Sequence, residues 1–280
     1  MPDKIVIYAP AKINLFLKIL SKREDGYHNI RSGITFINLF DEIEIKQSNK
    51  TTINYSGFFR PDVGYYKNCI IEKILKTISL LKNNHLNITV KKNIPVQAGL
   101  GAASTNAAGL IKGLQKLQLI KTENYKQYVR FGADVPCFLF EKDCLVRGIG
   151  DLISREHFPK YFFLLVKPKV NLSTKEMYSV LNSYIPKNSD EVESHEINEN
   201  DYGNDFEKIA IQKFDEIREI LSWLNNINQS IFANMTGSGS GCYAVFETKK
   251  FADQAQKEFI RKFPDLWNFV AENNIINDYQ

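Results

Sequence analysis

The sequence predicts an α+β protein of two domains, and three observations support this fold class. First, 280 residues with 44% hydrophobic and 24% charged side chains suit a globular chain that divides into two domains. Second, the first third is rich in β-branched and aromatic residues with partial alternation, which is typical of strands. Third, the last part orders its segments as a βαββαβ-type sandwich. We expect an N-terminal domain over residues 1–152 and a C-terminal domain over 153–280.

The first domain begins with segments whose composition predicts strands. The five expected strands are residues 4–9, 12–20, 30–38, 41–47 and 51–56. Isoleucine and leucine at spacings of three and four then predict a helix over 65–81. A short strand over 86–92 leads into a glycine-rich run. There Ser104 or Thr105 is expected to cap a helix that continues through 106–117.

A further helix, capped by Thr122, is expected over 122–131, ahead of the tight sequence "GADVPCFLF". The second domain then alternates strands and helices. The expected strands are 161–168, 231–235, 241–247 and 266–272, and the expected helices are 174–183, 205–225 and 250–262. The polar, turn-rich segment 186–205 is expected to be a surface excursion.

Charge and composition exclude several classes of function. A net charge of +4 is too small and dispersed for a nucleic-acid-binding face, although it suits an anionic small molecule. No apolar run is long enough to span a bilayer, and the N-terminal residues do not resemble a signal peptide. The four cysteines lack CxxC spacing, so we expect neither a zinc site nor a disulfide framework but reduced core thiols in a cytoplasmic protein.

A glycine-rich run over 93–110, "NIPVQAGLGAASTNAAGL", is the first candidate site. It lacks the lysine of a Walker A loop and the third glycine of a dinucleotide fingerprint. A strand, a glycine loop and a helix N-terminus still supply backbone N–H groups that attract phosphate, and Ser104 and Thr105 add hydroxyls. Taken alone, the run favours a simpler interpretation, a well-capped helix that follows a flexible turn.

The other candidates are also ambiguous when taken one at a time. The segment "MTGSGSGCYAVF" over 235–246 is a second glycine loop beside a strand, where simple turns are common. Lys12 lies in a strand between apolar residues, so it either faces water or has a buried partner. Asp134 in "GADVP" is either a turn cap or a buried acid, and "DGYH" places Tyr27 and His28 after an Asp-Gly turn.

In this order and spacing, the segments resemble the GHMP kinase superfamily. The resemblance is carried by "PAKINLFLKI", "REDGYHNIRSGITFINLFDEIEI", "IPVQAGLGAASTNAA", "GADVPCFLF", "NDFE" and "MTGSGSGCYAVF", and it spans most of the chain. It implies an N-terminal ATP-binding domain similar to ribosomal protein S5 domain 2 and a C-terminal ferredoxin-like α/β sandwich. "DGYH" and "GADVP" resemble the branch that phosphorylates a cytidine diphosphate-bearing alcohol of the non-mevalonate isoprenoid pathway.

The resemblance also implies residue roles for an ATP-dependent transfer. ATP, accompanied by Mg²⁺, is expected along the first loop, which comprises Pro95, Val96, Gln97, Ala98, Gly99, Leu100, Gly101, Ala102, Ala103, Ser104 and Thr105. Asp134 is implied as the general base for the acceptor hydroxyl, with Lys12 beside it to orient the hydroxyl and stabilise negative charge. Such a buried Lys–Asp pair keeps the carboxylate ionised. Whether protein side chains also hold the Mg²⁺ stays open, and none is assigned as a metal ligand.

Substrate contacts are implied in the same way. Tyr27 and His28 take the places of cytosine-recognition residues, and Tyr178 that of an aromatic residue on the other side of the base. Asn14 is expected near the transferred phosphate. The loop that closes over the site from the second domain contains Gly237, Ser238 and Gly239. The implied partner is therefore a small molecule, not nucleic acid or a membrane, and the implied state is a monomer or weak homodimer.

Two departures from the superfamily pattern affect the first loop. The usual loop is close to P-x-G-x-G-L-G-G-G-S-S, whereas this chain has Gln97, Ala98, Ala102, Ala103 and Thr105 at the corresponding places. Alanine disfavours positive φ, so we expect the loop geometry to differ there or to be strained. The segment between the loop and "GADVP" is also modestly shortened.

Three alternatives remain. Another kinase of the same superfamily would act on an alcohol such as homoserine or a mevalonate derivative, and "DGYH" argues against it. A nucleotide-binding protein without turnover would have the same fold, but Lys12 and Asp134 are both retained. A structural protein with two glycine turns would require all six motifs to coincide by chance.

Overall fold

A computed structural model describes residues 4–61, 69–78, 85–121, 124–181 and 202–274. The larger sheet has the order β3-β4-β2-β5-β6, with β1 paired to β2. Its strands are β1 (Lys4–Lys22), β2 (His28–Gln47), β3 (Thr52–Ser56), β4 (Leu86–Lys91), β5 (Cys144–Gly148) and β6 (Leu152–Arg155). The α+β fold class is confirmed.

Strands β1 and β2 replace the four separate strands expected for this region. They pair as one long antiparallel hairpin, with register shifts between Pro10 and Ala11, between Asn14 and Phe16, and further along. The expected breaks at 10–11 and 39–40 fall at one register shift, where Pro10 pairs with Phe40 and Ala11 with Ile37, so they are a β-bulge rather than turns. Proline has no N–H for the ladder and is tolerated at such an irregularity.

The bulge at Pro10 also exchanges the two faces of β1. Before it, Ile7 and Ala9 pack in the core that contains the first domain's helices. After it, Ala11 and Ile13 pack in a different core that they share with the smaller sheet. The side chains that alternate with Ala11 and Ile13 along β1, among them Lys12, consequently point to the helix side of the sheet.

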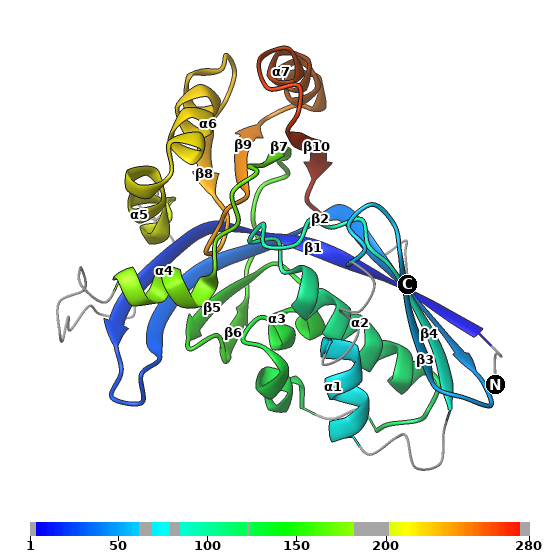
Figure 1. Ribbon diagram of the computed structural model, residues 1–280. Coiled ribbons are helices and arrows are strands. Elements are labelled where there is room, and N and C mark those ends of the chain that lie inside the picture. Colours follow the sequence, from blue (N-terminus) through cyan, green and yellow to red (C-terminus); the bar gives the residue numbers. More distant parts are fainter. Residues whose placement is uncertain (1–3, 62–68, 79–84, 122–123, 182–201, 275–280) are drawn as a thin grey trace.

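The helices of the first domain lie on one side of β1 and β2, and the smaller sheet lies on the other side (Figure 1). They are α1 (Ile70–Thr77), α2 (Ala102–Lys116), a 3-10 helix (Tyr125–Phe131) and α3 (Val135–Phe140). The expected helix over 65–81 contains α1, and its remaining residues apart from 69 and 78 lie outside the described part of the chain.

Two helix starts differ from expectation. Helix α2 begins at Ala102 after Gly101, whose φ of 76° only glycine adopts readily, so neither Ser104 nor Thr105 is its cap. The segment expected as a helix over 122–131 is a 3-10 helix, and Asn124 caps it by accepting a hydrogen bond from the Lys126 N–H. The expected cap, Thr122, lies outside the described residues.

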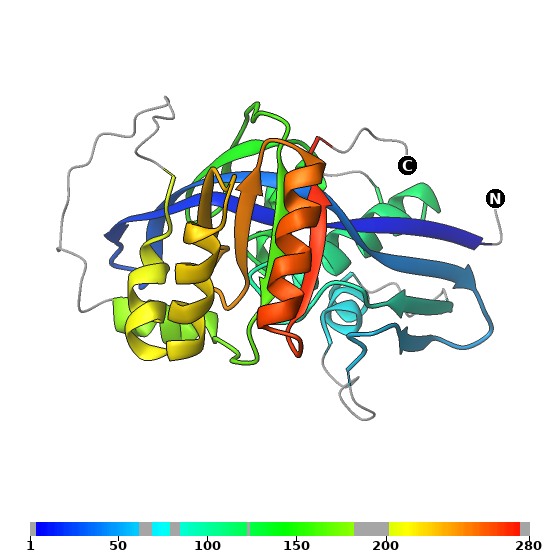
Figure 2. The same cartoon turned by 90° about the horizontal axis from the view of Figure 1, so that it is seen from above.

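The smaller sheet has the order β10-β7-β9-β8, and its three strand pairs are antiparallel. It comprises β7 (Phe162–Lys167), β8 (Phe232–Met235), β9 (Cys242–Phe246) and β10 (Trp267–Glu272). Its helices are α4 (Thr174–Leu181), α5 (Asp205–Lys213), α6 (Asp215–Asn226) and α7 (Lys249–Lys262). Figure 2 looks down on α6 and α7, which cover the outer face of this sheet. The expected βαββαβ order is confirmed.

The helix expected over 205–225 is interrupted. Phe214 is extended, with φ −130° and ψ 104°, and separates α5 from α6. The surface excursion expected over 186–205 lies outside the described residues up to position 201. No described helix has both the length and the apolar character that a bilayer crossing requires.

Strand β6 pairs with β5 in the larger sheet, and β7 begins the smaller one. A boundary after residue 152 would therefore cut through β6. We propose that the division lies between Arg155 and Phe162. The two parts remain joined, because Leu17 and Ile19 of β1 pack in the core of the smaller sheet's helices.

Candidate active site

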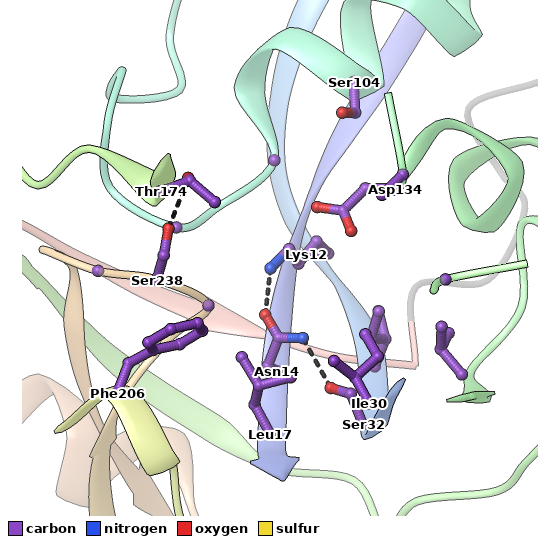
Figure 3. Close-up of a pocket in the computed structure, with 18 of the residues that line it drawn as sticks. Lys12, Asn14, Leu17, Ile30, Ser32, Ser104, Asp134, Thr174, Phe206 and Ser238 are labelled. Atoms are coloured by element: carbon purple, nitrogen blue, oxygen red, sulfur yellow. Dashed lines mark hydrogen bonds between the residues drawn. The ribbon is translucent and has the colours of Figure 1, made fainter. Parts of the chain in front are cut away.

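A cavity of about 390 Å³, the first cavity, lies where the larger sheet, α2, α3 and the two glycine loops meet (Figure 3). Its lining includes Lys12 and Asn14 from β1 and Asp134 from the turn before α3. The first glycine loop (95–105) and the second glycine loop (235–241) face it from opposite domains. Residues from distant parts of the sequence thus share one cavity.

Lys12 and Asn14 are two residues apart on β1, and both face this cavity. Lys12 is 3% exposed, and its Nζ donates a hydrogen bond to Asn14 Oδ1. Asn14 Nδ2 donates to Ser32 Oγ at 2.8 Å, and Ser32 Oγ donates to Phe16 O at 2.6 Å. This chain of hydrogen bonds fixes the orientation of the Asn14 amide, so its oxygen accepts from the lysine.

Burial lowers the pKa of Lys12, and the negative charge of Asp134 opposes that shift. The electrostatic attraction acts through space. Among the described residues the direct hydrogen-bond partner of the ammonium is Asn14, and no ion pair shorter than 4.0 Å joins Lys12 to Asp134. Lys12 and Asp134 are thus not in direct contact. Both face the first cavity, which leaves room for a ligand between them.

Asp134 precedes α3, where a carboxylate often caps a helix. Its side chain makes no capping hydrogen bond. It points into the cavity toward Lys12, with the Ser104 hydroxyl on the α2 side (Figure 3). Of the two interpretations open from the sequence, turn cap or acid, the capping role is wrong, and the half-buried carboxylate is available to a ligand.

The first glycine loop has positive φ at Gly99 (67°), Gly101 (76°) and Gln97 (53°). Ala98, Ala102 and Ala103 do not have positive φ, and the last two lie in α2. The expectation that these alanines distort or strain the loop is therefore wrong. The residue of this loop that has a positive φ but is not a glycine is Gln97.

The backbones of the two glycine loops pack directly against each other. A β-carbon on Gly99 would lie 1.9 Å from Thr236 O, and one on Gly241 would lie 2.3 Å from Ala98 O. The Ser240 N–H donates to Gln97 O at 3.1 Å, and Lys12 N–H donates to Leu100 O at 3.2 Å. Glycine is required at these contacts because the backbones touch.

Not every residue of the first loop faces the cavity. Those that line it are Gln97, Gly99, Gly101, Ala102, Ala103 and Ser104. Pro95, Val96, Ala98, Leu100 and Thr105 are not part of the lining. Thr105 is 1% exposed, and its hydroxyl has no hydrogen-bond partner among the described residues, so of the two hydroxyls singled out only Ser104 is placed for a ligand.

A second cavity of about 780 Å³ adjoins the first. The two share the lining residues Ile30, Ala133, Ile149 and Tyr178, so they are neighbours separated by no more than these side chains. The "DGYH" turn between β1 and β2 forms one wall, with Tyr27 62% exposed and His28 buried.

The aromatic residues of the second cavity contact each other. The rings of His28 and Tyr178 stack, with centroids 4.9 Å apart and an interplanar angle of 29°. Burial, with a smaller effect of Asp134, raises the pKa of Tyr178 to about 12, so its hydroxyl stays protonated at neutral pH. Tyr178 thus lies directly against His28, and the placement of Tyr27, His28 and Tyr178 around a cytosine stays a prediction.

Three cationic side chains surround the second cavity, and we call them the basic rim. They are Lys73 of α1, Arg130 of the 3-10 helix and Lys175 of α4. In the described part of the chain none of the three forms an ion pair. Asp25, the acidic residue that lines the same cavity, is paired with Arg23 at 2.9 Å. The rim thus presents a net positive charge to whatever occupies the cavity.

The second glycine loop reaches the first cavity through Gly237, Ser238 and Gly239. The hydroxyls of Ser238 and Thr174 are hydrogen-bonded at 2.8 Å (Figure 3). Thr174 begins α4, the helix that carries Tyr178. The second glycine loop is therefore hydrogen-bonded to the helix that carries Tyr178, a residue that lines both cavities.

No group of three or more His, Cys, Asp or Glu side chains suited to a metal ion occurs among the described residues. The described lining offers one carboxylate, Asp134, and the Ser104 hydroxyl. This donor set fits a Mg²⁺ ion whose remaining ligands are phosphate oxygens and water.

Sequence reasoning missed several residues that the fold brings to the site. Ser32 is brought beside Asn14 by the pairing of β1 with β2, and Thr174 and Phe206 come from the second domain. Ser32 and Phe206 lie in the quoted segments "REDGYHNIRSGITFINLFDEIEI" and "NDFE", but neither segment indicated that these particular residues face the site.

Comparisons with known proteins agree with this geometry. Residues 66–142 match the family described as "GHMP kinases N terminal domain", and residues 187–265 match "GHMP kinases C terminal". Three relatives named 4-diphosphocytidyl-2-C-methyl-D-erythritol kinase were compared. The protein from Francisella tularensis is 32% identical over 93% of this chain and 94% of its own length. That from Pelagibacter ubique is 34% identical over 92% and 94%, and that from Anaplasma phagocytophilum 34% over 98% and 95%.

Solved structures share the fold. A crystal structure of 4-(cytidine 5'-diphospho)-2C-methyl-D-erythritol kinase superposes with a TM-score of 0.77 at 23% identity, covering 96% of this chain and 100% of that one. The mevalonate kinase of Methanococcus jannaschii gives a TM-score of 0.62 at 16% identity, covering 96% and 98%.

Proposed function

The chain belongs to the GHMP kinase family, among its members named 4-diphosphocytidyl-2-C-methyl-D-erythritol kinase, and from this membership we propose its reaction. We propose that it transfers the γ-phosphoryl group of ATP to the 2-hydroxyl of 4-diphosphocytidyl-2-C-methyl-D-erythritol. This would be a step of the non-mevalonate isoprenoid pathway.

One observation carries the proposal. The cavity that contains Lys12 and Asp134 adjoins a second cavity with aromatic walls and a basic rim. The first cavity suits the transfer of a phosphoryl group between two oxygens. The second suits a base attached to a diphosphate, because rings can stack on the base and cations attract the phosphates.

In the proposed reaction Asp134 acts as the general base. Its carboxylate accepts the proton of the acceptor hydroxyl, and the hydroxyl oxygen forms a bond to the γ-phosphorus. The bond between that phosphorus and the β–γ bridging oxygen breaks, and ADP leaves with its electrons. The absence of a capping hydrogen bond leaves the carboxylate free for this proton.

Lys12 would lie beside the transferred group. Asn14 Oδ1 accepts one of the hydrogen bonds of the ammonium, and the Asn14 orientation is fixed through Ser32. The remaining N–H groups of Lys12 are available to orient the acceptor oxygen or a phosphate oxygen. Phosphoryl transfer depends mainly on such positioning and charge neutralisation.

The triphosphate of ATP would lie along the first glycine loop, where the N-terminal residues of α2 face the first cavity. Backbone N–H groups at a helix N-terminus attract phosphate oxygens. Mg²⁺ bound to the nucleotide would neutralise phosphate charge, with Ser104 and Asp134 as the protein groups placed near it.

The test is an ATP-dependent phosphorylation assay with equal concentrations of 4-diphosphocytidyl-2-C-methyl-D-erythritol, mevalonate and homoserine. We expect ADP release and a phosphorylated product only with the cytidine-bearing alcohol. The Asp134→Asn variant, which retains size and polarity, should lose turnover by about 100-fold or more while still binding ATP. Comparable turnover with a cytidine-free alcohol would contradict the substrate assignment.

A further inference from the structure

The segment "NDFE" was singled out in the sequence, yet the proposed reaction uses none of its residues. It forms the start of α5, and all four side chains are turned toward the active site or the strands that build it. We propose that Asn204 is a positioning residue, which holds the second glycine loop in place against Lys12 and the first glycine loop. The inference rests on the proposed function for its kinetic consequence, but not for its structural one.

The side-chain amide of Asn204 serves two purposes. Its Oδ1 accepts a hydrogen bond from the Phe206 N–H at 3.0 Å, which caps α5. Its Nδ2 donates to Met235 O at 2.6 Å and to Gly237 O at 2.8 Å. Asn204 is 7% exposed, so both donated bonds are protected from water. An ordinary N-cap needs only the oxygen.

The two accepting carbonyls flank Thr236, which joins three parts of the active site. Its Oγ1 accepts from the Asn14 N–H at 3.1 Å and donates to Gly99 O at 3.3 Å. By donating to the carbonyls of Met235 and Gly237, Asn204 stabilises the position of Thr236 and, with it, the contact between β1 and the two glycine loops.

Gly237 lies close to both the first glycine loop and Lys12. A β-carbon there would lie 3.1 Å from Gly99 O and 3.2 Å from Lys12 Nζ. A displacement of the Gly237 carbonyl would therefore change the surroundings of the lysine ammonium directly. The position of that ammonium matters for the rate, because misplacing reacting groups by about 1 Å can lower it by about 100-fold.

The neighbours of Asn204 keep it in place. The Asp205 carboxylate accepts from the Ile19 N–H at 2.7 Å, and Gly203 O accepts from the Leu17 N–H at 2.9 Å, so the start of α5 is tied to β1. Glu207 Oε2 accepts from the Met235 N–H at 2.8 Å. Met235 is thus held at its N–H by Glu207 and at its carbonyl by Asn204.

Phe206 contacts a different part of the site, so a variant at this position provides an independent comparison. Its ring packs edge-on against Tyr178, with centroids 4.9 Å apart and an interplanar angle of 87°. Removing the ring should affect binding in the second cavity, whereas removing the Asn204 donors should affect the transfer step.

The experiment separates the two purposes of the Asn204 amide. Asn204→Ser keeps a side-chain oxygen for the cap and loses both donors. We expect kcat to fall by roughly 10- to 100-fold, with KM for the cytidine-bearing acceptor changing by less than about threefold. Phe206→Leu should show the reverse pattern, with a higher acceptor KM and a smaller loss of kcat.

The matched control is Asn124→Ser. Asn124 also caps a helix through its Oδ1, with the Lys126 N–H at 3.0 Å, but it is exposed and donates to neither glycine loop. If Asn204 acts only as a cap, serine should replace it at both positions, so both serine variants should leave kcat unaltered, and that result would overturn the proposal.

Hydrogen exchange provides a readout that does not depend on turnover. Asn204→Ser should accelerate exchange of the Thr236 and Ser240 amides by at least about tenfold, whereas Asn124→Ser should not. Unchanged exchange there would also overturn the proposal. If the wild-type enzyme failed to phosphorylate the cytidine-bearing alcohol, the proposed function would fail, but the exchange comparison would still decide the role of Asn204.

Discussion

The backbone of Gly99 lies against the carbonyl of Thr236, so that a β-carbon at position 99 would lie 1.9 Å from that oxygen. Since the two residues belong to different glycine loops, the contact fixes the distance between the two halves of the active site. It also explains why a glycine is needed at position 99. The first prediction follows from this contact.

Gly99→Ala should separate the two loops and lower kcat/KM for ATP by at least about 100-fold. It combines a steric clash with a positive φ of 67°. Gly26→Ala is the control for stability, because Gly26 has a φ of 85° and nothing within 4 Å of the added carbon. Thermal unfolding should show a larger loss of stability for Gly99→Ala than for Gly26→Ala. Equal losses would mean that the steric clash at position 99 does not destabilise the protein.

The second prediction concerns Gln97, which adopts a φ of 53° at a position where the superfamily has glycine. Gln97→Gly should stabilise the protein or leave its stability unchanged, because a left-handed conformation costs a non-glycine residue about 1 kcal/mol. Ala98→Gly, one residue away at ordinary φ, should instead lower stability by about 0.5–1 kcal/mol through added chain entropy. Chemical denaturation of both variants measures the contrast, and a destabilised Gln97→Gly would contradict this account.

The third prediction is a pH dependence of stability that originates at Lys12. Burial lowers its pKa from the ordinary 10.5, so between the lowered value and 10.5 the unfolded chain binds more protons than the folded one. Stability therefore rises with pH in that window, by up to about 1.4 kcal/mol per pH unit for this group. Below the window the buried charge is a constant cost.

Lys12→Met should remove that contribution while abolishing turnover. The free energy of unfolding of the wild type relative to the variant should increase as pH is raised through the window. Denaturant titrations at a series of alkaline pH values test this, with Lys22→Met as a control at an exposed lysine. A wild-type-minus-variant difference that stays constant with pH would show that burial does not disfavour the charged ammonium.

The fourth prediction concerns the basic rim of the second cavity. Replacing Lys73, Arg130 and Lys175 together by glutamine should raise KM for the cytidine diphosphate-bearing acceptor by about 10-fold at low salt and less at high salt. KM for ATP should change little, because the rim lies in the second cavity. Lys126→Gln, on the same 3-10 helix but outside both cavities, is the control. A salt-independent effect, or an equal change in KM for ATP, would argue against an electrostatic role.

Much of the fold could be predicted because hydrophobic periodicity reports local structure directly. It placed α1, α2, α7 and the four strands of the smaller sheet. It could not show that the break at Pro10 is a bulge within one strand, since a bulge and a turn interrupt the pattern alike. The break at Phe214 was missed because the apolar spacing continues across it.

The candidate site could be predicted only in part. Lys12, Asp134 and both glycine loops carry recognisable local sequence. Ser32 lies within the segment that begins "REDGYH", but its place beside Asn14 depends on the register of β1 and β2, which no local pattern reveals. The alanines of the first loop were the wrong residues to suspect, since φ at each position depends on where α2 begins. The sequence pattern predicted the cap three or four residues too late, at Ser104 or Thr105 instead of Gly101.

The exchange of faces at Pro10 has a consequence for synthesis on the ribosome. Ala11, Ile13 and Leu15 share one core with Tyr243, Val245 and Ala271, which follow them by more than two hundred residues. This apolar face must therefore remain uncovered while more than two hundred intervening residues emerge. Until then the nascent chain exposes an aggregation-prone strand. We therefore expect this protein to depend more on a chaperone that shields the strand than does a protein whose domains fold one after another.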